Sequence, residues 1–303
     1  MLSRLQQDQY QSEGFLVLPG FKSGAEVAAL RARALQIVEA FDADAHRAIF
    51  STSDQARRSA GADFLASAEG IQCFFEEEAF DAAGRLRQPK ALSINKIGHA
   101  MHDLDPVFER FSRNAALAEL AADLGLVDAK LWQSMYIFKQ PGIGGEVKWH
   151  QDATFFDTTP STVTAFWFAL EDATRDNGCL WVQPGGHHGP LRERFVRGVQ
   201  GDGGNGGNGG NSGDEDAVQM QPLDATPWPD TRTAKPVEVA AGTLLCFHGR
   251  LPHWSAPNRS AVSRHAYTLH ATDGRAHYAA HNWLRRSAAL PVRGFAPAPE
   301  LRT

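Results

Sequence analysis

The feature that most constrains the fold is a series of short runs, rich in aromatic and β-branched residues, that begins after Ala129. Gly, Pro and Asn separate the runs, and each run has the length of a strand rather than of a helix. Short strands at such spacing predict an antiparallel barrel or a double-sheet jelly roll. The runs occupy residues 131–140, 162–170, 179–183, 237–240, 243–248 and 265–271.

Helical signals precede these runs. Ser23 and Glu26 have capping-box spacing ahead of apolar residues at helical intervals, which predicts an amphipathic helix over 23–41. Asp105 and Pro106 form an N-cap and first-turn signal for a second helical region. The sequence therefore predicts a mainly β fold with flanking helices that dominate the first third of the chain.

The composition is that of a soluble globular protein. Hydrophobic residues make up 43% and charged residues 21%, and the formal net charge of -5 gives no global attraction for nucleic acid or anionic membranes. The cysteines, Cys73, Cys179 and Cys246, lack metal-binding spacing and predict buried free thiols in a reducing compartment. Neither a signal peptide nor an apolar run of membrane-spanning length is evident. We expect a cytoplasmic protein without a membrane span.

The motif Trp-His-Gln-Asp at 149–152 supplies the first candidate site residues. On a strand, residues i and i+2 project from one face, so His150 and Asp152 can hold one metal while a distant histidine completes the site. Two histidines and one carboxylate with open coordination positions are typical of non-heme Fe(II) oxygenases. The pair alone is weak evidence, but the predicted barrel adds weight because a small barrel interior accommodates one ligand.

The third ligand is not decided by spacing. His253 is favoured because it follows a Gly-Arg-Leu-Pro turn after a predicted strand, which places it at a barrel mouth rather than within a strand. For each candidate the alternative is a buried structural histidine. The histidines available downstream are His248, His253, His265, His270 and His281.

Arg264 begins the next predicted strand and suggests a cosubstrate. An Fe(II) ion held on one face leaves positions for O2 and for a chelator such as 2-oxoglutarate. The far carboxylate of 2-oxoglutarate needs a buried cation, and a guanidinium binds carboxylates bidentately. Ser255 can add a hydrogen bond. The alternative for Arg264 is a surface ion pair.

Segments along nearly the whole chain resemble the phytanoyl-CoA dioxygenase (PhyH) family of Fe(II)/2-oxoglutarate oxygenases. The resemblance implies a single domain over 1–303 with the double-stranded β-helix, or cupin-like jelly roll. A Gly- and Asn-rich insertion at about 200–216 departs from the family pattern and has the composition of a flexible linker. The segments that carry the resemblance are 8–10, 14–18, 93–100, 133–141, 144–147, 171–174 and 177–181.

The resemblance also implies a set of site residues. Without it, Met135 and Trp167 are explained as core packing and Lys96 as a charge at the barrel rim. His187 and His248 are further candidates for assisting the metal site. The implied Fe(II) ligands are His150, Asp152 and His253, and the implied 2-oxoglutarate contacts are Lys96, Met135, Gln151, Trp167, Ser255 and Arg264.

The implied reaction consumes 2-oxoglutarate and O2, releases succinate and CO2, and hydroxylates a small molecule, such as an acyl-CoA or another lipid-like or natural-product molecule. One alternative is a catalytically silent module that binds metal and a 2-oxoacid. Another is a zinc hydrolase that uses the same ligands. Arg192, Arg194 and Arg197 could contact a CoA phosphate, but a solvated charged face explains them as well.

Overall fold

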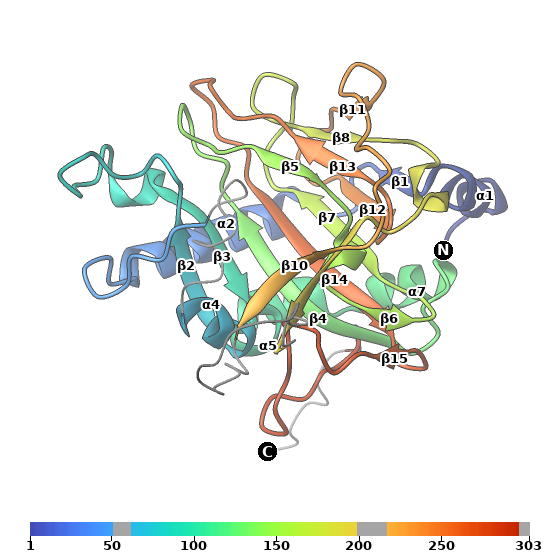
Figure 1. Cartoon of the computed structure of the whole chain (residues 1–303). Helices are drawn as coiled ribbons and strands as arrows, with labels where there is room; N and C mark the ends of the chain where they lie inside the picture. Colours follow the sequence, from blue (N-terminus) through green and yellow to red (C-terminus); the bar gives the residue numbers. More distant parts are fainter. Residues whose placement is uncertain (51–61, 199–216, 297–303) are drawn as a thin grey trace, which may run out of the picture.

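Two facing antiparallel sheets form the centre of the molecule in this computed structural model (Figure 1), which describes residues 1–50, 62–198 and 217–296 of the chain. The larger sheet draws strands from both halves of the sequence. In spatial order it contains β1 (Phe15–Leu18), β12 (Leu244–His248), β7 (Thr164–Ala169), β14 (Ala266–Asp273), β4 (Ala129–Ile137), β3 (Ile94–His99) and β2 (Ile71–Phe75).

The second sheet is built from much shorter strands. It runs in the order β11 (Lys235–Val237), β8 (Leu180–Val182), β13 (His253–Ser255) and β5 (Val147–His150). Two ladders of two strands complete the β structure, β9 (Glu193–Arg197) with β10 (Val218–Pro222) and β6 (Thr158–Thr159) with β15 (His277–Tyr278). The predicted mainly β jelly roll is confirmed.

Strand β7 shows how the large sheet is buried on both faces. Phe166 and Phe168 belong to the hydrophobic cluster that also holds the helix residues, whereas Ala165 and Trp167 belong to a separate cluster with β8 and β11. Successive side chains of a strand point to opposite faces, so the two clusters lie on the two sides of the sheet. One side therefore packs on helices and the other faces the second sheet.

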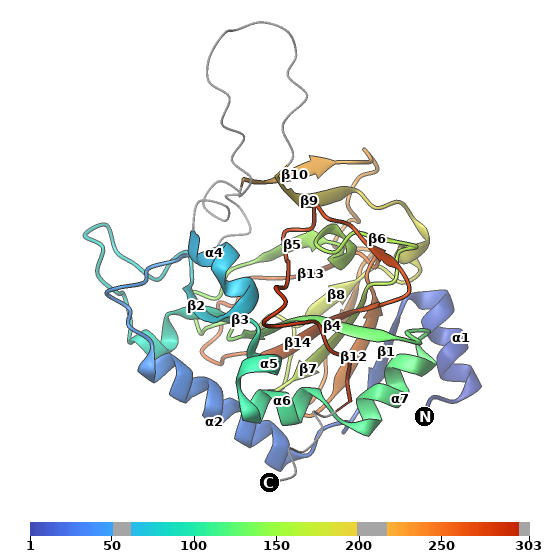
Figure 2. The same cartoon turned by 90° about the horizontal axis from the view of Figure 1, so that it is seen from below.

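Helices cover the outer face of the large sheet, as Figure 2 shows for α2, α6 and α7. The predicted helix over 23–41 is confirmed as α2, where Ser23 and Glu26 form the capping box. The helices are α1 (Arg4–Glu13), α2 (Gly24–Ala40), α4 (Ala62–Ala66), α5 (Met101–Leu104), α6 (Pro106–Ser112) and α7 (Ala115–Asp123), and the 3-10 turns are η1 (Ser67–Glu69), η2 (Lys90–Leu92), η3 (Asp152–Thr154) and η4 (Gly186–His188).

The structure adds detail to the helical elements expected in the first half of the chain. The second helical region is divided between α6 and α7, because the Asn114 side chain caps a new helix by accepting from the Leu117 N–H. Helices account for more of the described first third than strands do, as expected, and β2 and β3 also extend the large sheet there. The insertion at about 200–216 lies outside the described residues. Within the described ranges, every helix is too short or too polar to cross a bilayer.

Candidate metal centre

The inner face of the large sheet provides one wall of a cavity of about 600 Å³. Strand register sets Met135 and Trp167 on either side of Thr268, so these side chains form a row across three neighbouring strands. In the next row, His270 lies opposite Gln133. Directly paired residues share a face of a sheet, and all of these side chains line the cavity.

The short strands of the second sheet bring two histidines together from distant parts of the sequence. His253 pairs directly with His150 across β13 and β5, and their ring centres lie 4.0 Å apart. This corrects the expectation that His253 lies outside a strand, because it is the first residue of β13. Pairing to β5 and to β8 on its other side fixes its position.

Asp152 joins this pair from just beyond the end of β5. The strand ends at His150 and Asp152 begins η3, so the expectation that both residues lie within one strand is corrected. Gln151 between them keeps extended backbone angles, φ -124° and ψ 132°. The two side chains therefore still project to the same side, as they would on a strand.

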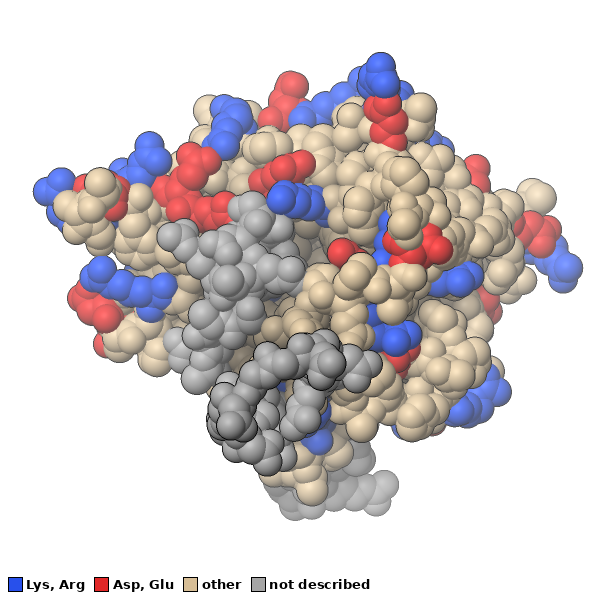
Figure 3. All heavy atoms as spheres, viewed as in Figure 1, with Lys and Arg blue, Asp and Glu red and all other residues tan. Residues whose placement is uncertain are grey.

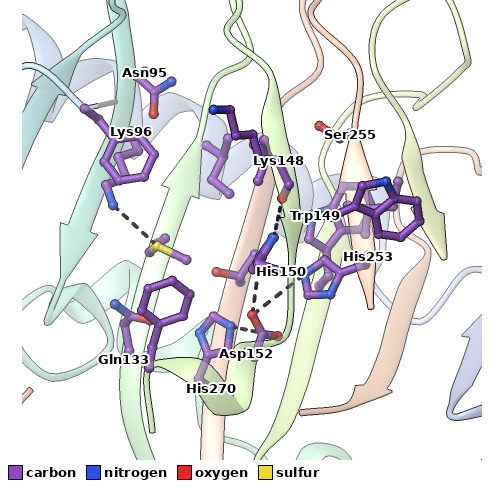
Figure 4. A pocket seen from close by; sticks show the side chains of 18 of the residues that line it. Asn95, Lys96, Gln133, Lys148, Trp149, His150, Asp152, His253, Ser255 and His270 are labelled. Atoms are coloured by element: carbon purple, nitrogen blue, oxygen red, sulfur yellow. Dashed lines mark hydrogen bonds and ion pairs between the residues drawn. The ribbon is translucent and has the colours of Figure 1, made fainter. Parts of the chain in front are cut away.

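The three side chains form a compact ligand set (Figure 4). Asp152 Oδ1 lies 3.7 Å from both His150 Nε2 and His253 Nε2, and one ligand atom from each residue lies within 4.8 Å of the others. Asp152 and His253 are buried, whereas His150 is partly exposed. This spacing allows one ion to contact all three residues.

Backbone carbonyls orient the two imidazoles. His150 Nδ1 lies 2.8 Å from the Lys148 carbonyl oxygen, and His253 Nδ1 lies 3.0 Å from the Leu251 carbonyl oxygen. A carbonyl only accepts, so each Nδ1 carries a proton, and in the neutral imidazole each Nε2 is left with a lone pair. Hydrogen bonds of this kind fix metal-binding tautomers. The donor set of two imidazoles and a carboxylate fits Fe(II), with the side toward the cavity open.

His270 supports the carboxylate from the large sheet. Its Nε2 lies 3.4 Å from Asp152 Oδ2, on the side away from the other two histidines (Figure 4). Burial alone would raise the pKa of Asp152, but His270 and His253 together hold this pKa below its ordinary value. The carboxylate is therefore ionised and available to a cation at neutral pH.

The other end of the cavity is basic. Arg264 is fully buried, its Nε donates to the Gly178 carbonyl oxygen at 3.1 Å, and its Cζ lies 5.4 Å from the centre of the Trp167 ring. Its Nη1 is buried without a hydrogen-bond partner among the described residues. Burial lowers the pKa of Arg264 to about 10, so the guanidinium stays charged at neutral pH. Ser255 lines the same end.

The predicted 2-oxoglutarate contacts divide into two groups. Lys96, Met135, Trp167, Ser255 and Arg264 all line the cavity. Gln151 is outside this lining.

The Gln151 amide is fully buried and bonds to backbone groups. It donates to the Pro190 and Arg250 carbonyl oxygens at 3.0 and 2.8 Å and accepts from the Arg192 N–H at 3.0 Å. The position of this side chain therefore does not support a direct contact with 2-oxoglutarate.

The remaining histidine candidates have structural partners away from the ligand set. His187 bonds to the Gln11 carbonyl oxygen, and His248 accepts from the Arg250 N–H. His265 lies 2.9 Å from the Tyr136 hydroxyl, and His281 lies 2.8 Å from Asp157 Oδ2. Among the described residues, the cavity lining includes none of these four.

Two cavity residues have roles that the sequence did not assign. His270 was only one of several open choices, and its contact with Asp152 depends on the register of β14. Lys139 was not singled out, although it is buried at the basic end of the cavity. The apolar residues 136–138, which directly precede this lysine, are the only signal in the sequence that it is buried.

Aromatic side chains form much of the remaining wall. Trp283 stacks on Phe64 with ring centres 4.5 Å apart, and Lys96 Nζ lies 3.6 Å from the centre of the Phe50 ring. Phe155 and Phe156 continue this wall beside the candidate ligands. The cavity thus has a polar ligand set, a basic end and an apolar region.

Known proteins resemble the chain over most of its length. The sequence profile of the phytanoyl-CoA dioxygenase (PhyH) family matches residues 10–266. Phytanoyl-CoA dioxygenase 1 of Oryza sativa subsp. japonica is 44% identical over 91% of this chain and 92% of its own. Phytanoyl-CoA dioxygenase domain-containing protein 1 of Bos taurus is 41% identical over 96% and 97%.

Solved structures share the fold. The epimerase SnoN from nogalamycin biosynthesis, crystallised with Fe3+, alpha ketoglutarate and nogalamycin RO, has a TM-score of 0.60 at 17% identity, covering 98% of this chain and 96% of its own. Such distant similarity supports the jelly roll alone. The match to the profile and the identity to curated relatives go further, and on these grounds the chain belongs to the phytanoyl-CoA dioxygenase (PhyH) family of dioxygenases.

Proposed function

We propose that this protein is an Fe(II)- and 2-oxoglutarate-dependent dioxygenase that hydroxylates a small molecule. One observation carries the proposal: the set of His150, Asp152 and His253 and the buried pair of Arg264 and Ser255 face a single cavity. A metal chelator with a distant carboxylate matches both ends. A zinc hydrolase would leave the buried guanidinium without a role.

The chain's own residues bind and orient the reactants. His150, Asp152 and His253 would hold Fe(II), and Arg264 with Ser255 would hold the far carboxylate of 2-oxoglutarate through charge-assisted hydrogen bonds. When bound, Fe(II) and 2-oxoglutarate supply the O2 chemistry that converts 2-oxoglutarate, O2 and a substrate C–H group into succinate, CO2 and the C–OH product. The aromatic wall excludes water from this region.

The substrate that fits the cavity best is a small molecule with an apolar body. The cavity volume of about 600 Å³ lies within the usual range for small-molecule sites. Two of the three arginines considered for a CoA phosphate have partners within the protein, since Arg194 Nε lies 3.2 Å from Asp157 Oδ2 and Arg192 donates to the Pro227 carbonyl oxygen. Acidic and basic side chains are interspersed over the face in Figure 3, which is unlike a nucleic-acid-binding surface.

Anaerobic titration tests the proposed reaction. Protein loaded with Fe(II) would receive 2-oxoglutarate and then O2, and succinate would be measured against a zinc-loaded control. We expect succinate only with Fe(II), even without substrate, because uncoupled turnover consumes 2-oxoglutarate slowly. Binding of 2-oxoglutarate without any succinate, with or without candidate substrates, would instead favour the silent binding module. Succinate release would then serve to screen acyl-CoA thioesters and natural products.

We also propose a cytoplasmic location. Cys73, Cys179 and Cys246 are buried and unpaired, as expected for thiols kept in a reducing compartment. Fractionation of cells that express the tagged full-length chain tests this location, and recovery in an oxidising compartment would contradict it.

A further inference from the structure

Lys139 is a buried cation beside the basic end of the cavity, and it has no role in the family pattern described above. Its side chain is 2% exposed, and its backbone has φ 42°, in the left-handed region that residues other than glycine rarely adopt. Burial of a lysine is costly unless its ammonium is hydrogen-bonded. The position therefore calls for a specific explanation.

The ammonium of Lys139 is committed to protein acceptors. Nζ lies 2.6 Å from Ser255 Oγ, 2.8 Å from the Gly145 carbonyl oxygen and 3.5 Å from the Ser255 carbonyl oxygen. An ammonium has three N–H donors and no lone pair. In this ammonium form Ser255 Oγ accepts from Lys139, so the Ser255 hydroxyl hydrogen points away from Nζ.

The Ser255 hydroxyl is therefore preset as a donor. Ser255 is fully buried and lines the cavity together with Arg264, whose Nη1 is buried without a partner among the described residues. A serine hydroxyl can normally rotate to donate or accept. Beside Lys139 it presents its hydrogen to the same region as the guanidinium, and this region suits an anionic oxygen.

A glycine holds both basic residues in place. A Cβ at position 178 would lie 2.5 Å from Lys139 Cε, so any side chain there would displace the lysine. The Gly178 carbonyl oxygen accepts from Arg264 Nε, and Gly178 itself has φ +87°. The Asn-Gly turn thus fixes the relative positions of the lysine and the arginine.

We infer that Lys139 is a positioning residue, which orients the Ser255 hydroxyl toward the far carboxylate of 2-oxoglutarate. This inference rests on the proposed function. Lys139 does not contact the ligand itself, because its donors are used on Ser255 and Gly145. Burial, followed by Arg264, lowers the pKa of Lys139 well below its ordinary value, while Glu76 and Glu146 oppose that shift. A bound carboxylate adds negative charge nearby and favours the ammonium form.

The test compares two ligands by anaerobic calorimetry on Fe(II)-loaded protein. 2-Oxopentanoate has the same chelating group as 2-oxoglutarate but carries a methyl group in place of the far carboxylate. We expect Lys139→Met to weaken binding of 2-oxoglutarate by about ten-fold or more, the usual effect of a hydrogen bond to a charged group. Binding of 2-oxopentanoate should change by less than about two-fold, a selectivity that general damage to the fold would not produce.

Two further variants separate positioning from charge. In a Ser255→Ala background, Lys139→Met should weaken binding of 2-oxoglutarate by less than about two-fold further. The hydroxyl that Lys139 orients is already absent there. The matched control is Lys130→Met in β4, the strand that precedes Lys139, because it removes a lysine outside the cavity, where Lys130 pairs with Asp128. It should leave the affinity for both ligands unchanged.

Several outcomes would overturn the inference. Equal weakening of both ligands by Lys139→Met would make the lysine structural, and additive effects of Lys139→Met and Ser255→Ala would make it act independently of the hydroxyl. If Lys139→Met does not fold, Lys139→Gln keeps an uncharged NH2 donor group and should weaken binding of 2-oxoglutarate alone, by less than Ser255→Ala does. Failure of the unaltered protein to bind 2-oxoglutarate would overturn the proposed function itself, and this inference with it.

Discussion

Asp103 and Asp152 are both buried carboxylates among basic side chains, yet they occupy different kinds of site. The side chain of Asp103 is 1% exposed and that of Asp152 is 6% exposed. Burial would raise both pKa values, but the neighbouring groups, chiefly His102 for Asp103 and His270 for Asp152, lower both. Burial and pKa direction alone therefore do not distinguish a structural carboxylate from a candidate metal ligand.

The partners make the distinction. Asp103 lies 2.6 Å from Arg113, 3.1 Å from Arg293 and 3.5 Å from Arg286, which are permanent cations that satisfy the carboxylate within the protein. Asp152 is surrounded by imidazoles, two of which direct lone pairs toward the same space. The Asp103 carboxylate is compensated by cations of the protein itself, whereas the Asp152 cluster is a set of ligand atoms that suits an added cation.

The largest expected effect is loss of activity in Asp152→Ala. This change removes the only anionic group of the ligand set, so succinate formation should fall below detection and Fe(II) should bind weakly. The melting temperature of the metal-free variant should stay within about 2–4 °C of the original, equivalent to about 1 kcal/mol. A fully active variant would remove Asp152 from the metal centre.

Asp103→Ala should show the opposite pattern. Removing the carboxylate leaves buried cations uncompensated, which costs about 3–5 kcal/mol of the free energy of unfolding. Chemical denaturation measures this loss, and the variant that remains folded should bind Fe(II) normally. A loss below about 1 kcal/mol, or weakened Fe(II) binding, would erase the proposed contrast between the two aspartates.

Arg264→Ala tests the basic end of the cavity. We expect the apparent affinity for 2-oxoglutarate to fall by about 1.5–3 kcal/mol, or roughly 10- to 150-fold, because a charge-assisted interaction is lost. Binding of Fe(II) alone should be unchanged. The dependence of succinate formation on 2-oxoglutarate concentration measures the effect, and an unaltered dependence would exclude Arg264 from the site.

His248 is a buried ionisable group that belongs to neither cluster. Burial, followed by His187 and Arg250, lowers its pKa to about 4, and its Nδ1 must remain unprotonated to accept from the Arg250 N–H. Because the folded pKa lies below the unfolded value of about 6.5, stability is lost as the pH falls from 6.5 toward 4. Below about pH 4 the folded protein also binds the proton, so the free energy of unfolding falls no further through His248.

His248→Asn should keep an acceptor near the Arg250 N–H while removing this titration. The slope of unfolding free energy against pH between 6.5 and 4 should therefore decrease by up to about 1.4 kcal/mol per pH unit. Denaturation curves at several pH values measure the slope. An identical slope in both proteins would show that His248 titrates normally.

The sequence predicted β4, β7, β8, β12 and β14 because their apolar runs show strand character, but it did not predict the ladders of β9 with β10 and β6 with β15. Strands β2 and β3 were not predicted because they are short segments separated by a long loop. Strand β13 was not predicted because it spans only His253–Ser255. Capping residues were informative for α2 because a cap is a local interaction. Division of the next helical region depended on Asn114, a cap in the middle of an apolar pattern.

Prediction of the site failed where burial depends on distant segments. His150 and Asp152 are close in sequence and were identified by local geometry. The choice of His253, in contrast, relied on a turn and a resemblance, and the structure positions it by cross-strand pairing. Lys139 was not identified from the sequence, since its partner Ser255 and the neighbouring Gly178 lie far along the chain.

The Gln151 amide has a consequence for how the metal is acquired. It ties the backbone between His150 and Asp152 to the carbonyl oxygen of Arg250, in the turn that leads to His253. Both sides of the ligand set are thereby joined through protein hydrogen bonds before any ion arrives. Loading and exchange of the ion should then proceed without refolding, so that occupancy follows the concentration of free metal.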